Sequence, residues 1–303
     1  MKWTLAICTS LVLTLAIMQG CMGGGRTPTA VENPVVTRQT IEGVGACQGV
    51  FVHEGSVWMY GDDKDRGVIK RLEWSGPDVP DGPHLVDVGE KYKLKLYRDY
   101  SVKQQPDMKL PSEPIPHPTG LTHHDDYGTF IGNTVDQKGT IFHITWWGFK
   151  QSGSLDTWIQ NVIEDDLAKN GTRPEFVRWN GRWLIATADY GDAGNALRLY
   201  DPEKLKKAKK TSDPGVLVAE FQCGPFVQSM HWIDEENTLV LAQNQVAGLR
   251  YRLTLLKFGE GDTPPRVERM IDLGYPEDEL EGFAILEPGW HKLNKVESRS
   301  HCV

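Results

Sequence analysis

The sequence lacks several features that would place it in a common functional class. It contains no Gly-x-Ser-x-Gly, His-Glu-x-x-His or P-loop motif, and no Gly-x-Gly-x-x-Gly follows a predicted strand, so the usual hydrolase and nucleotide-binding signatures are missing. Positive charge is not in excess, because 41 acidic residues against 33 Lys and Arg residues give a net charge of −8. This balance argues against a general nucleic-acid-binding or anionic-membrane surface.

The sequence also lacks a long apolar run. Residues 5–17 form a run of 13 residues after Lys2, which is short for a bilayer span and typical of a signal peptide over residues 1–20. The string from Ile17 to Cys21 resembles a bacterial lipobox, with Cys21 as the lipidated first residue and residues 21–34 as a flexible tether. An ordinary secretory signal with an incidental Cys21 is the alternative. We expect a protein of the bacterial cell envelope, outside the cytoplasm, held at the membrane by its lipid anchor only.

Cysteine is scarce as well. Of the five cysteines, Cys8 would be lost with the signal peptide and Cys21 would carry the lipid, which leaves Cys47, Cys223 and Cys302. An oxidising compartment would permit one disulfide among these three. Cys47 and Cys223 both precede copies of a repeated phrase and are the preferred pair, with three buried thiols as the alternative.

The chain repeats a short phrase at a long period. The last four copies start 55, 54 and 53 residues apart, a spacing typical of repeat architectures. The five copies occupy residues 48–52, 119–123, 174–178, 228–232 and 281–285.

Each copy opens a unit with further strand-like runs separated by Gly- and Pro-rich turns. The pattern predicts an all-β fold, a β-propeller of four-stranded antiparallel blades, as one domain over residues 35–303. Five blades is the direct count. The first interval of 71 residues contains an insertion at about 90–118, which leaves six blades as the alternative. Because the fifth unit has too few residues for four strands, we expect residues 35–42 to supply its outer strand and close the ring.

Polar residues recur at two positions of the unit that meet on one face of the ring. Because this face surrounds the channel mouth, the side chains there are candidates to bind a small polar ligand through hydrogen bonds or a Ca²⁺ ion through their oxygens. For each Asp or Asn, bonding to a following turn is the alternative, and for Glu281 it is pairing with Arg173. The starts of first strands supply Gln48, Thr119, Arg173, Gln228 and Glu281, and the ends of second strands supply Asp62, Asn133, Asp189 and Asn244.

The cluster from His123 to Asp126 has the composition of a metal site. Its repeat position places it in the turn between first and second strands, on the opposite face, and neighbouring strand residues point to opposite sides. We therefore do not expect a metal site there.

Phrases such as Pro118-Thr119-Gly120-Leu121 and Glu281-Gly282-Phe283-Ala284 resemble those of NHL-repeat, strictosidine-synthase-like and SMP-30 gluconolactonase propellers. The gluconolactonase branch holds a divalent metal through a Glu, an Asn and an Asp and opens lactone rings. This resemblance implies Glu281, Asn133 and Asp189 as metal ligands. The leading hypothesis is an envelope propeller that binds a small polar ligand or a protein partner at its channel face. The alternative is an enzyme, a Ca²⁺-dependent lactonase or esterase-like hydrolase.

Overall fold

The computed structural model describes residues 29–30, 39–76, 80, 84–146, 150, 155, 158–246, 250–273, 279–286 and 298–302. The predicted signal peptide, Cys21 and most of the predicted tether lie outside these residues. None of the helices within the ranges given above is long and apolar enough to cross a membrane.

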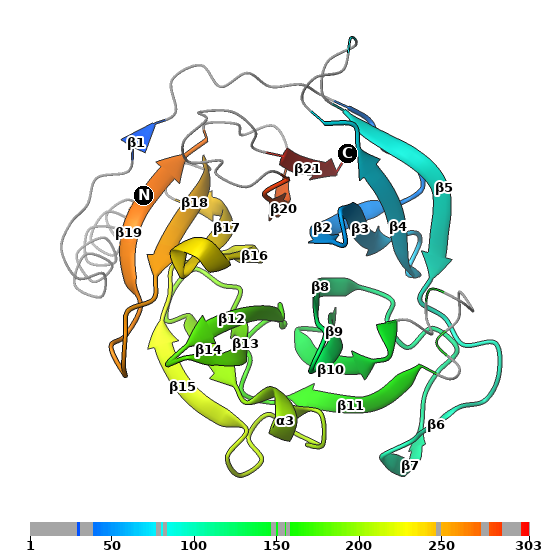
Figure 1. Ribbon diagram of the computed structural model, residues 1–303. Coiled ribbons are helices and arrows are strands. Elements are labelled where there is room, and N and C mark those ends of the chain that lie inside the picture. Colours follow the sequence, from blue (N-terminus) through cyan, green and yellow to red (C-terminus); the bar gives the residue numbers. More distant parts are fainter. Residues whose placement is uncertain are drawn as a thin grey trace, which may run out of the picture.

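Four antiparallel sheets stand around a central axis (Figure 1), so the all-β propeller prediction is confirmed. In each sheet the strands follow one another in chain order from the axis outward. Blade 1 contains β2 (Ala46–His53), β3 (Ser56–Asp62), β4 (Gly67–Trp74) and β5 (Leu85–Lys93). Blade 2 contains β8 (Pro118–His124), β9 (Gly128–Val135), β10 (Lys138–Ile144) and β11 (Ile159–Asp165).

Blades 3 and 4 complete the set. Blade 3 contains β12 (Glu175–Trp179), β13 (Arg182–Ala188), β14 (Ala196–Tyr200) and β15 (Leu217–Gln222). Blade 4 contains β16 (Val227–Ile233), β17 (Thr238–Val246), β18 (Arg250–Lys257) and β19 (Arg266–Asp272). Two short helices, α3 (Pro202–Leu205) and η1 (Asp234–Glu236), lie in the loops of these two blades.

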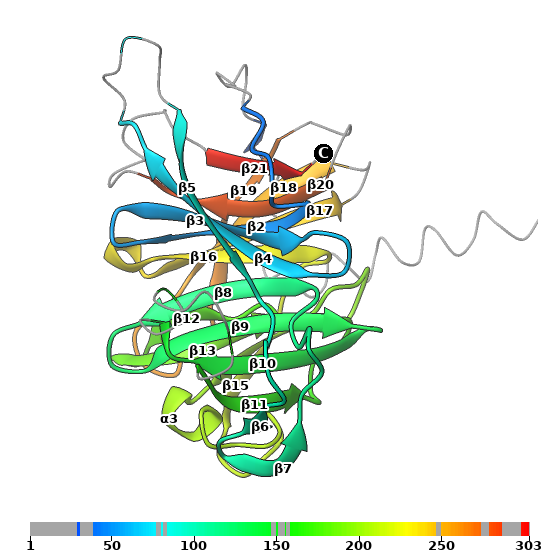
Figure 2. The ribbon, with the colours of Figure 1, turned by 90° about the vertical axis from the view of Figure 1, so that its right-hand side faces the viewer.

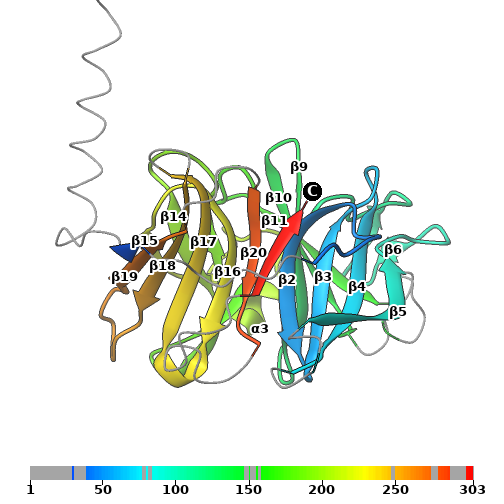
Figure 3. The same ribbon diagram turned by 90° about the horizontal axis from the view of Figure 1, so that it is seen from above.

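The prediction of five complete blades is wrong, because the structure has four. The fifth copy of the phrase forms β20 (Glu279–Ala284), which pairs with β21 (Ser298–Cys302) in a two-stranded sheet. This pair stands between β16 of blade 4 and β2 of blade 1 (Figures 1 and 3).

The predicted closure of the ring by an N-terminal strand is also not seen in the described residues. Residues 39–42 form no strand. The N-terminal strand is instead β1 (Thr29–Ala30), from the segment predicted to be a tether, and it pairs in parallel with β19. The C-terminal strand β21 lies at the junction in its place. An unfilled sheet edge favours such pairing, because its backbone groups need partners.

The insertion at about 90–118 does not form a sixth blade. It continues β5 to Lys93 and contains a hairpin of β6 (Ser101–Val102) and β7 (Gln105–Lys109). The hairpin lies at the outer rim beside β11 (Figure 2). The Tyr100 hydroxyl donates to the Ile159 carbonyl at 2.8 Å, and Gln105 Nε2 donates to the Val162 carbonyl at 2.6 Å. The insertion therefore covers the edge strand of blade 2.

Hydrophobic clusters fill the spaces between adjacent blades. Trp58 of blade 1 packs with Phe142 and Trp146 of blade 2, and Val177 of blade 3 packs with Trp232 of blade 4. The short sheet packs on blade 4 through its own buried Leu280 and Phe283. Burial of these apolar side chains is the main favourable contribution to folding, at roughly 25 cal/mol per Å².

The preferred disulfide between Cys47 and Cys223 is not formed. Cys47 packs in the core of blade 1, whereas Cys223 packs against the cluster between blades 3 and 4. Burial raises the pKa of the Cys223 thiol to about 12, which makes it a poor nucleophile. The side chain of Cys302 lies outside the described residues.

Four of the five inner strands carry a β-bulge at the same position of the repeated phrase. Each bulge leaves one extra residue without a partner in the ladder and redirects its side chain. The extra residues are Gln48, Thr119, Gln228 and Glu281. The fifth inner strand, β12, has no such shift and begins two residues after Arg173.

Glycines in blade 2 allow the segment before β12 to approach closely. A Cβ atom on Gly120 would lie 2.5 Å from Pro174 Cδ and 3.0 Å from Arg173 Cα, and one on Gly132 would lie 2.6 Å from Pro174 Cδ. These contacts are shorter than van der Waals separation, so glycine is required at both positions. The glycine of the phrase therefore fixes where Arg173 stands.

Gly120→Ala should destabilise the protein and displace Arg173. Overpacking against rigid backbone typically costs about 1–3 kcal/mol. Chemical denaturation at constant m-value would measure the loss in the free energy of unfolding. Gly259→Ala is the matched control, because a Cβ there meets only Thr263 at 3.4 Å. Equal stability of the two variants would contradict the packing argument.

Candidate functional site at the channel mouth

Three of the predicted site residues meet in one hydrogen-bonded group. Arg173 Nε donates to the Gln228 carbonyl at 2.9 Å, and its Nη2 donates to Gln228 Oε1 at 3.3 Å. Gln228 Nε2 in turn donates to Glu281 Oε1 at 3.0 Å. Gln228 thus connects the segment before blade 3 to the short sheet. Its side-chain amide stands between Arg173 and Glu281, which the sequence analysis considered as a direct pair.

Arg173 is held from both sides. The Thr119 hydroxyl, at the bulge of β8, donates to the Thr172 carbonyl at 2.6 Å. The Arg173 guanidinium carbon lies 5.1 Å from the centroid of the Tyr190 ring, which is cation–π distance. The arginine is only 6% exposed, so the site presents an ordered cation rather than a surface charge.

Tyr190 connects this group to the predicted residue Asn244. The Tyr190 hydroxyl donates to Asn244 Oδ1 at 3.3 Å, and Gln245 Nε2 donates to the Tyr190 oxygen at 3.4 Å. Gln245 Nε2 also lies 3.4 Å from Glu279 Oε1. The structure therefore joins four predicted residues with three that the sequence analysis did not select.

The three additional residues, Tyr190, Gln245 and Glu279, stand next to predicted positions. Tyr190 follows Asp189, Gln245 follows Asn244, and Glu279 precedes Glu281 by two residues. Residues two apart on a strand share a face unless a bulge intervenes. Extending each predicted position to its neighbours would have found them.

Burial controls the charge of the carboxyl group. It raises the pKa of Glu281 to about 9, the neighbouring Glu279 carboxylate adds to the increase, and the positive charge of Arg173 opposes it. Glu281 is therefore neutral at pH 7. A second inner-strand acid, Glu175, accepts from the Trp232 backbone N–H at 3.0 Å, and burial raises its pKa to about 8.

Two buried nitrogens of this group have no hydrogen-bond partner among the described residues. Unsatisfied buried polar groups are rare in folded proteins, and each costs about 1–3 kcal/mol. The two atoms are Arg173 Nη1 and Asn244 Nδ2, whereas the Glu281 carboxyl group hydrogen-bonds Glu279. Both side chains contact Tyr190, which marks the channel mouth as a candidate binding site.

The other predicted residues lie on the same face with partners of their own. Asp62 Oδ2 is 2.6 Å from His117 Nδ1, and Asn133 Oδ1 accepts from the His117 backbone N–H at 3.1 Å. Gln48 is half-buried at the bulge of β2. These contacts join blade 1 to blade 2, and the structure brings none of the three side chains into the Arg173 group.

Asp189 is fully buried and saturated with donors. It accepts from two nitrogens of Arg198, the nearer at 2.7 Å, and from the backbone N–H groups of Lys169 and Ala196. To bind Ca²⁺ with Glu281 and Asn133, its oxygens would have to leave these donors. In the described ranges, no three His, Cys, Asp or Glu side chains are placed to hold a metal ion. The Ca²⁺ site stays a prediction.

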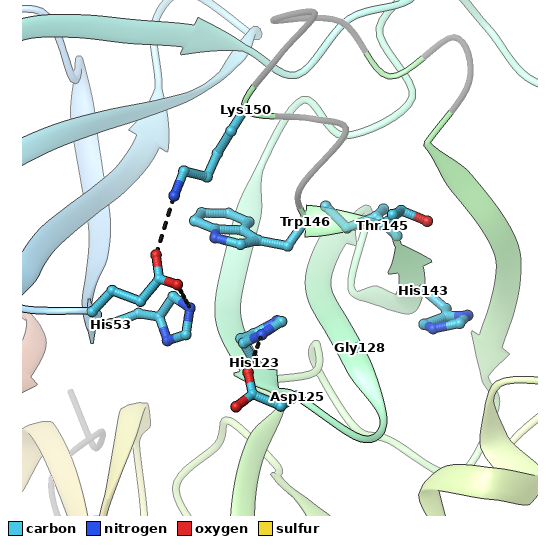
Figure 4. A pocket seen from close by; sticks show the side chains of 10 residues that line it. His53, His123, Asp125, Gly128, His143, Thr145, Trp146 and Lys150 are labelled. Carbon is cyan, nitrogen blue, oxygen red and sulfur yellow. Dashed lines mark hydrogen bonds and ion pairs between the residues drawn. The ribbon is translucent and has the colours of Figure 1, made fainter.

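A cavity of about 300 Å³ opens at the other end of the inner strands. It lies between blades 1 and 2, beside the ends of β2, β8 and β10 (Figure 4). Figure 4 shows Trp146 between Lys150 and His123. Lys150 pairs with Glu54 at 3.2 Å, and the His53 and His123 rings are 4.5 Å apart between centroids.

The histidines of this cavity confirm part of the repeat argument. His123 faces His53 and Trp146, whereas His124 packs on Phe176 and Trp183 of blade 3, so the two neighbours point to opposite sides. Burial lowers the pKa of both His53 and His123. The sequence analysis missed His53, because nothing in the phrase links it to His123.

Comparison with known sequences gives no assignment, since no protein-family profile and no curated protein matches the chain. Among solved structures, hydrazine synthase of Kuenenia stuttgartiensis is similar, with 10% identity, a TM-score of 0.40, and coverage of 78% of this chain and 51% of that chain. A Thermus thermophilus protein assigned as an oxidoreductase (glucose dehydrogenase) has 11% identity, a TM-score of 0.41, and coverage of 72% and 85%. A Bacteroides uniformis protein assigned as a 6-phosphogluconolactonase has 12% identity, a TM-score of 0.41, and coverage of 74% and 70%.

This chain spans about half of the hydrazine synthase chain. Similarity at this level assigns no activity, because folds host many functions. The propeller assignment rests on the arrangement of the sheets themselves.

Glu281→Gln should flatten the dependence of stability on pH. In the folded state the pKa of Glu281 is raised from 4.5 to about 9, so the folded protein holds a proton that the unfolded chain releases. Stability is then fully present below about pH 4.5 and falls as pH rises towards 9, by up to about 1.4 kcal/mol per pH unit. Glutamine keeps the acceptor for Gln228 and cannot ionise.

Denaturation curves at several pH values would measure this slope. Glu175 contributes a similar slope of its own, so the variant should lose part of the dependence and not all of it. Glu260→Gln, at an exposed turn residue, is the control. An unchanged profile for Glu281→Gln would mean that Glu281 is already ionised at neutral pH.

Proposed function

We propose that this protein is an envelope-anchored β-propeller that binds a small polar ligand at its channel mouth. The observation that carries the proposal is the pair of unpartnered buried nitrogens, Arg173 Nη1 and Asn244 Nδ2. Both side chains contact Tyr190, and Gln228 joins Arg173 to Glu281 of the short sheet. A ligand with several hydrogen-bonding groups would satisfy them together.

The proposal also rests on how the group meets solvent. Gln245 and Glu279 are exposed, and Tyr190 is half-buried and contacts both Arg173 and Asn244. The group therefore extends from the buried nitrogens to solvent. Binding sites of this kind combine a few placed polar groups with a largely preformed scaffold.

Arg173→Met should abolish binding of such a ligand without unfolding the protein. A compound present at about 100 times its Kd would add about 2.7 kcal/mol to stability, and roughly 2–4 °C per kcal/mol would follow in the melting temperature. We expect a screen of small polar metabolites by thermal shift to find compounds that stabilise the wild type.

Arg178→Met is the matched control, since Arg178 is exposed on β12, the strand that follows Arg173, and circular dichroism would establish that both variants fold. The proposed function would be wrong if no compound stabilised the wild type, or if stabilisation were equal in Arg173→Met.

The alternative function is a Ca²⁺-dependent lactonase or esterase-like hydrolase that uses Glu281, Asn133 and Asp189. It would require Asp189 to exchange four donors for a cation. A metal that binds only the folded state must stabilise it. Because we do not expect this metal site to form, EDTA and excess Ca²⁺ should leave the melting temperature unchanged. A rise with Ca²⁺ that disappears in Glu281→Ala would favour the hydrolase.

The anchor is the second part of the proposal. Lipidation of Cys21 would tether the propeller to the envelope through residues 21–34 and leave its mouth exposed outside the cytoplasm. Cys21→Ser should move the protein from the membrane fraction to the soluble fraction after cell fractionation. Retention in the membrane fraction would show that another segment or partner holds it there.

A further inference from the structure

We propose that the ligand is anchored at the channel mouth by a single carboxylate group, which Arg173 and Asn244 bind directly. This inference rests on the proposed function and specifies its ligand class. The unpartnered nitrogens Arg173 Nη1 and Asn244 Nδ2 are both donors. The complementary group is therefore an acceptor, and a carboxylate offers two oxygens with about four acceptor positions.

The orientation of Asn244 follows from its neighbours. The Tyr190 oxygen already receives a hydrogen bond from Gln245 Nε2, so its own proton is directed to Asn244 Oδ1. The amide nitrogen of Asn244 is then left as the open donor. Asn244 is fully buried and Arg173 nearly so, and neither donor reaches bulk water.

The charge of Arg173 and its partners favours an anionic ligand over a neutral one. The described partners of Arg173 are a carbonyl, an amide and a phenol ring, and none of them is anionic. Glu281, two hydrogen bonds away through Gln228, is neutral at pH 7 because burial raises its pKa to about 9. The Asp189 carboxylate also acts on Arg173 through its charge, but its oxygens bind Arg198. An anion bound at Nη1 would supply a counter-charge in direct contact with the buried guanidinium.

The same groups limit the charge of the ligand to one. A single guanidinium faces the site, and the exposed carboxylate of Glu279 lies beside it through Gln245. A phosphate dianion would be left with one unmatched charge next to a carboxylate, whereas a monocarboxylate would be balanced. Arginine suits this role because its planar nitrogens match carboxylate geometry and its charge persists when buried.

Matched pairs of compounds test the inference. Lactate and lactamide, or acetate and acetamide, have nearly the same shape and differ in charge, and inorganic phosphate serves as the dianion. We expect titration calorimetry at pH 7 to give at least tenfold tighter binding for each carboxylate than for its amide, with phosphate weaker than lactate. Arg173→Met should remove this preference, and Arg178→Met should retain it.

Arg173→Lys provides a second variant that keeps the charge. It should bind lactate more weakly than the wild type, because an ammonium cannot reproduce the geometry of Nη1 while keeping both bonds to Gln228. Lactamide binding as tightly as lactate would overturn the carboxylate inference. A carboxylate preference that survives in Arg173→Met would place the anion elsewhere and overturn it as well.

The two proposals can fail separately. If neutral compounds from the metabolite screen stabilise the wild type through Arg173 and no carboxylate does, the ligand site stands and the carboxylate inference is wrong. If no compound of any class stabilises the wild type, the proposed function itself is wrong, and this inference falls with it.

Discussion

The β-bulge at the start of four of the five inner strands is the constraint on which the rest of this structure depends. A regular ladder would give alternate residues to the two sides of each blade, and polar residues at the channel end would point into the inter-blade packing. The bulge adds one residue, so Gln48, Thr119, Gln228 and Glu281 are freed from the ladder. The repeated phrase therefore specifies a strand and also a bulged residue whose side chain is redirected towards the axis.

Two buried arginines, Arg198 and Arg173, differ in how completely their nitrogens are paired. Arg198 binds Asp189 at 2.7 Å and Glu220 at 2.8 Å, and none of its nitrogens is left without a partner. Arg173 is equally buried, yet its described contacts are neutral and one nitrogen has no partner. Because the chain pairs the buried Arg198 fully, the incomplete set of partners around Arg173 is the observation on which the proposed site rests.

Much of the fold could be predicted from the sequence, because blade order depends on short-range signals. Alternation, turn residues and the period of the phrase identify the strands of blades 1 to 4. Closure of the ring could not be predicted, because it depends on which backbone edge lies near which terminus. Thr29 and Ala30 pair with β19, and nothing in their composition distinguishes them from a tether.

The candidate site was predictable to a similar extent and for the same reason. The repeat placed Arg173, Gln228, Glu281 and Asn244 on one face, but it could not tell which polar residues find structural partners. Asp189 and Asn133 look equivalent to Asn244 in the sequence. In the structure, Asp189 meets Arg198 and Asn133 meets a backbone N–H, and those contacts depend on neighbouring loops that do not repeat.

The incomplete fifth unit explains why the site lies where it does. Among the described residues β20 has one strand partner, β21, and it otherwise packs against blade 4 and β2. Gln228 joins it to blade 4 at the bulged residue Glu281, so the two-stranded sheet also supplies part of the channel mouth. A ligand that bridges Arg173 and this sheet would bind the closed ring more tightly than an opened one. By mass action, binding of such a ligand would then stabilise the packing of β20 beside blade 4.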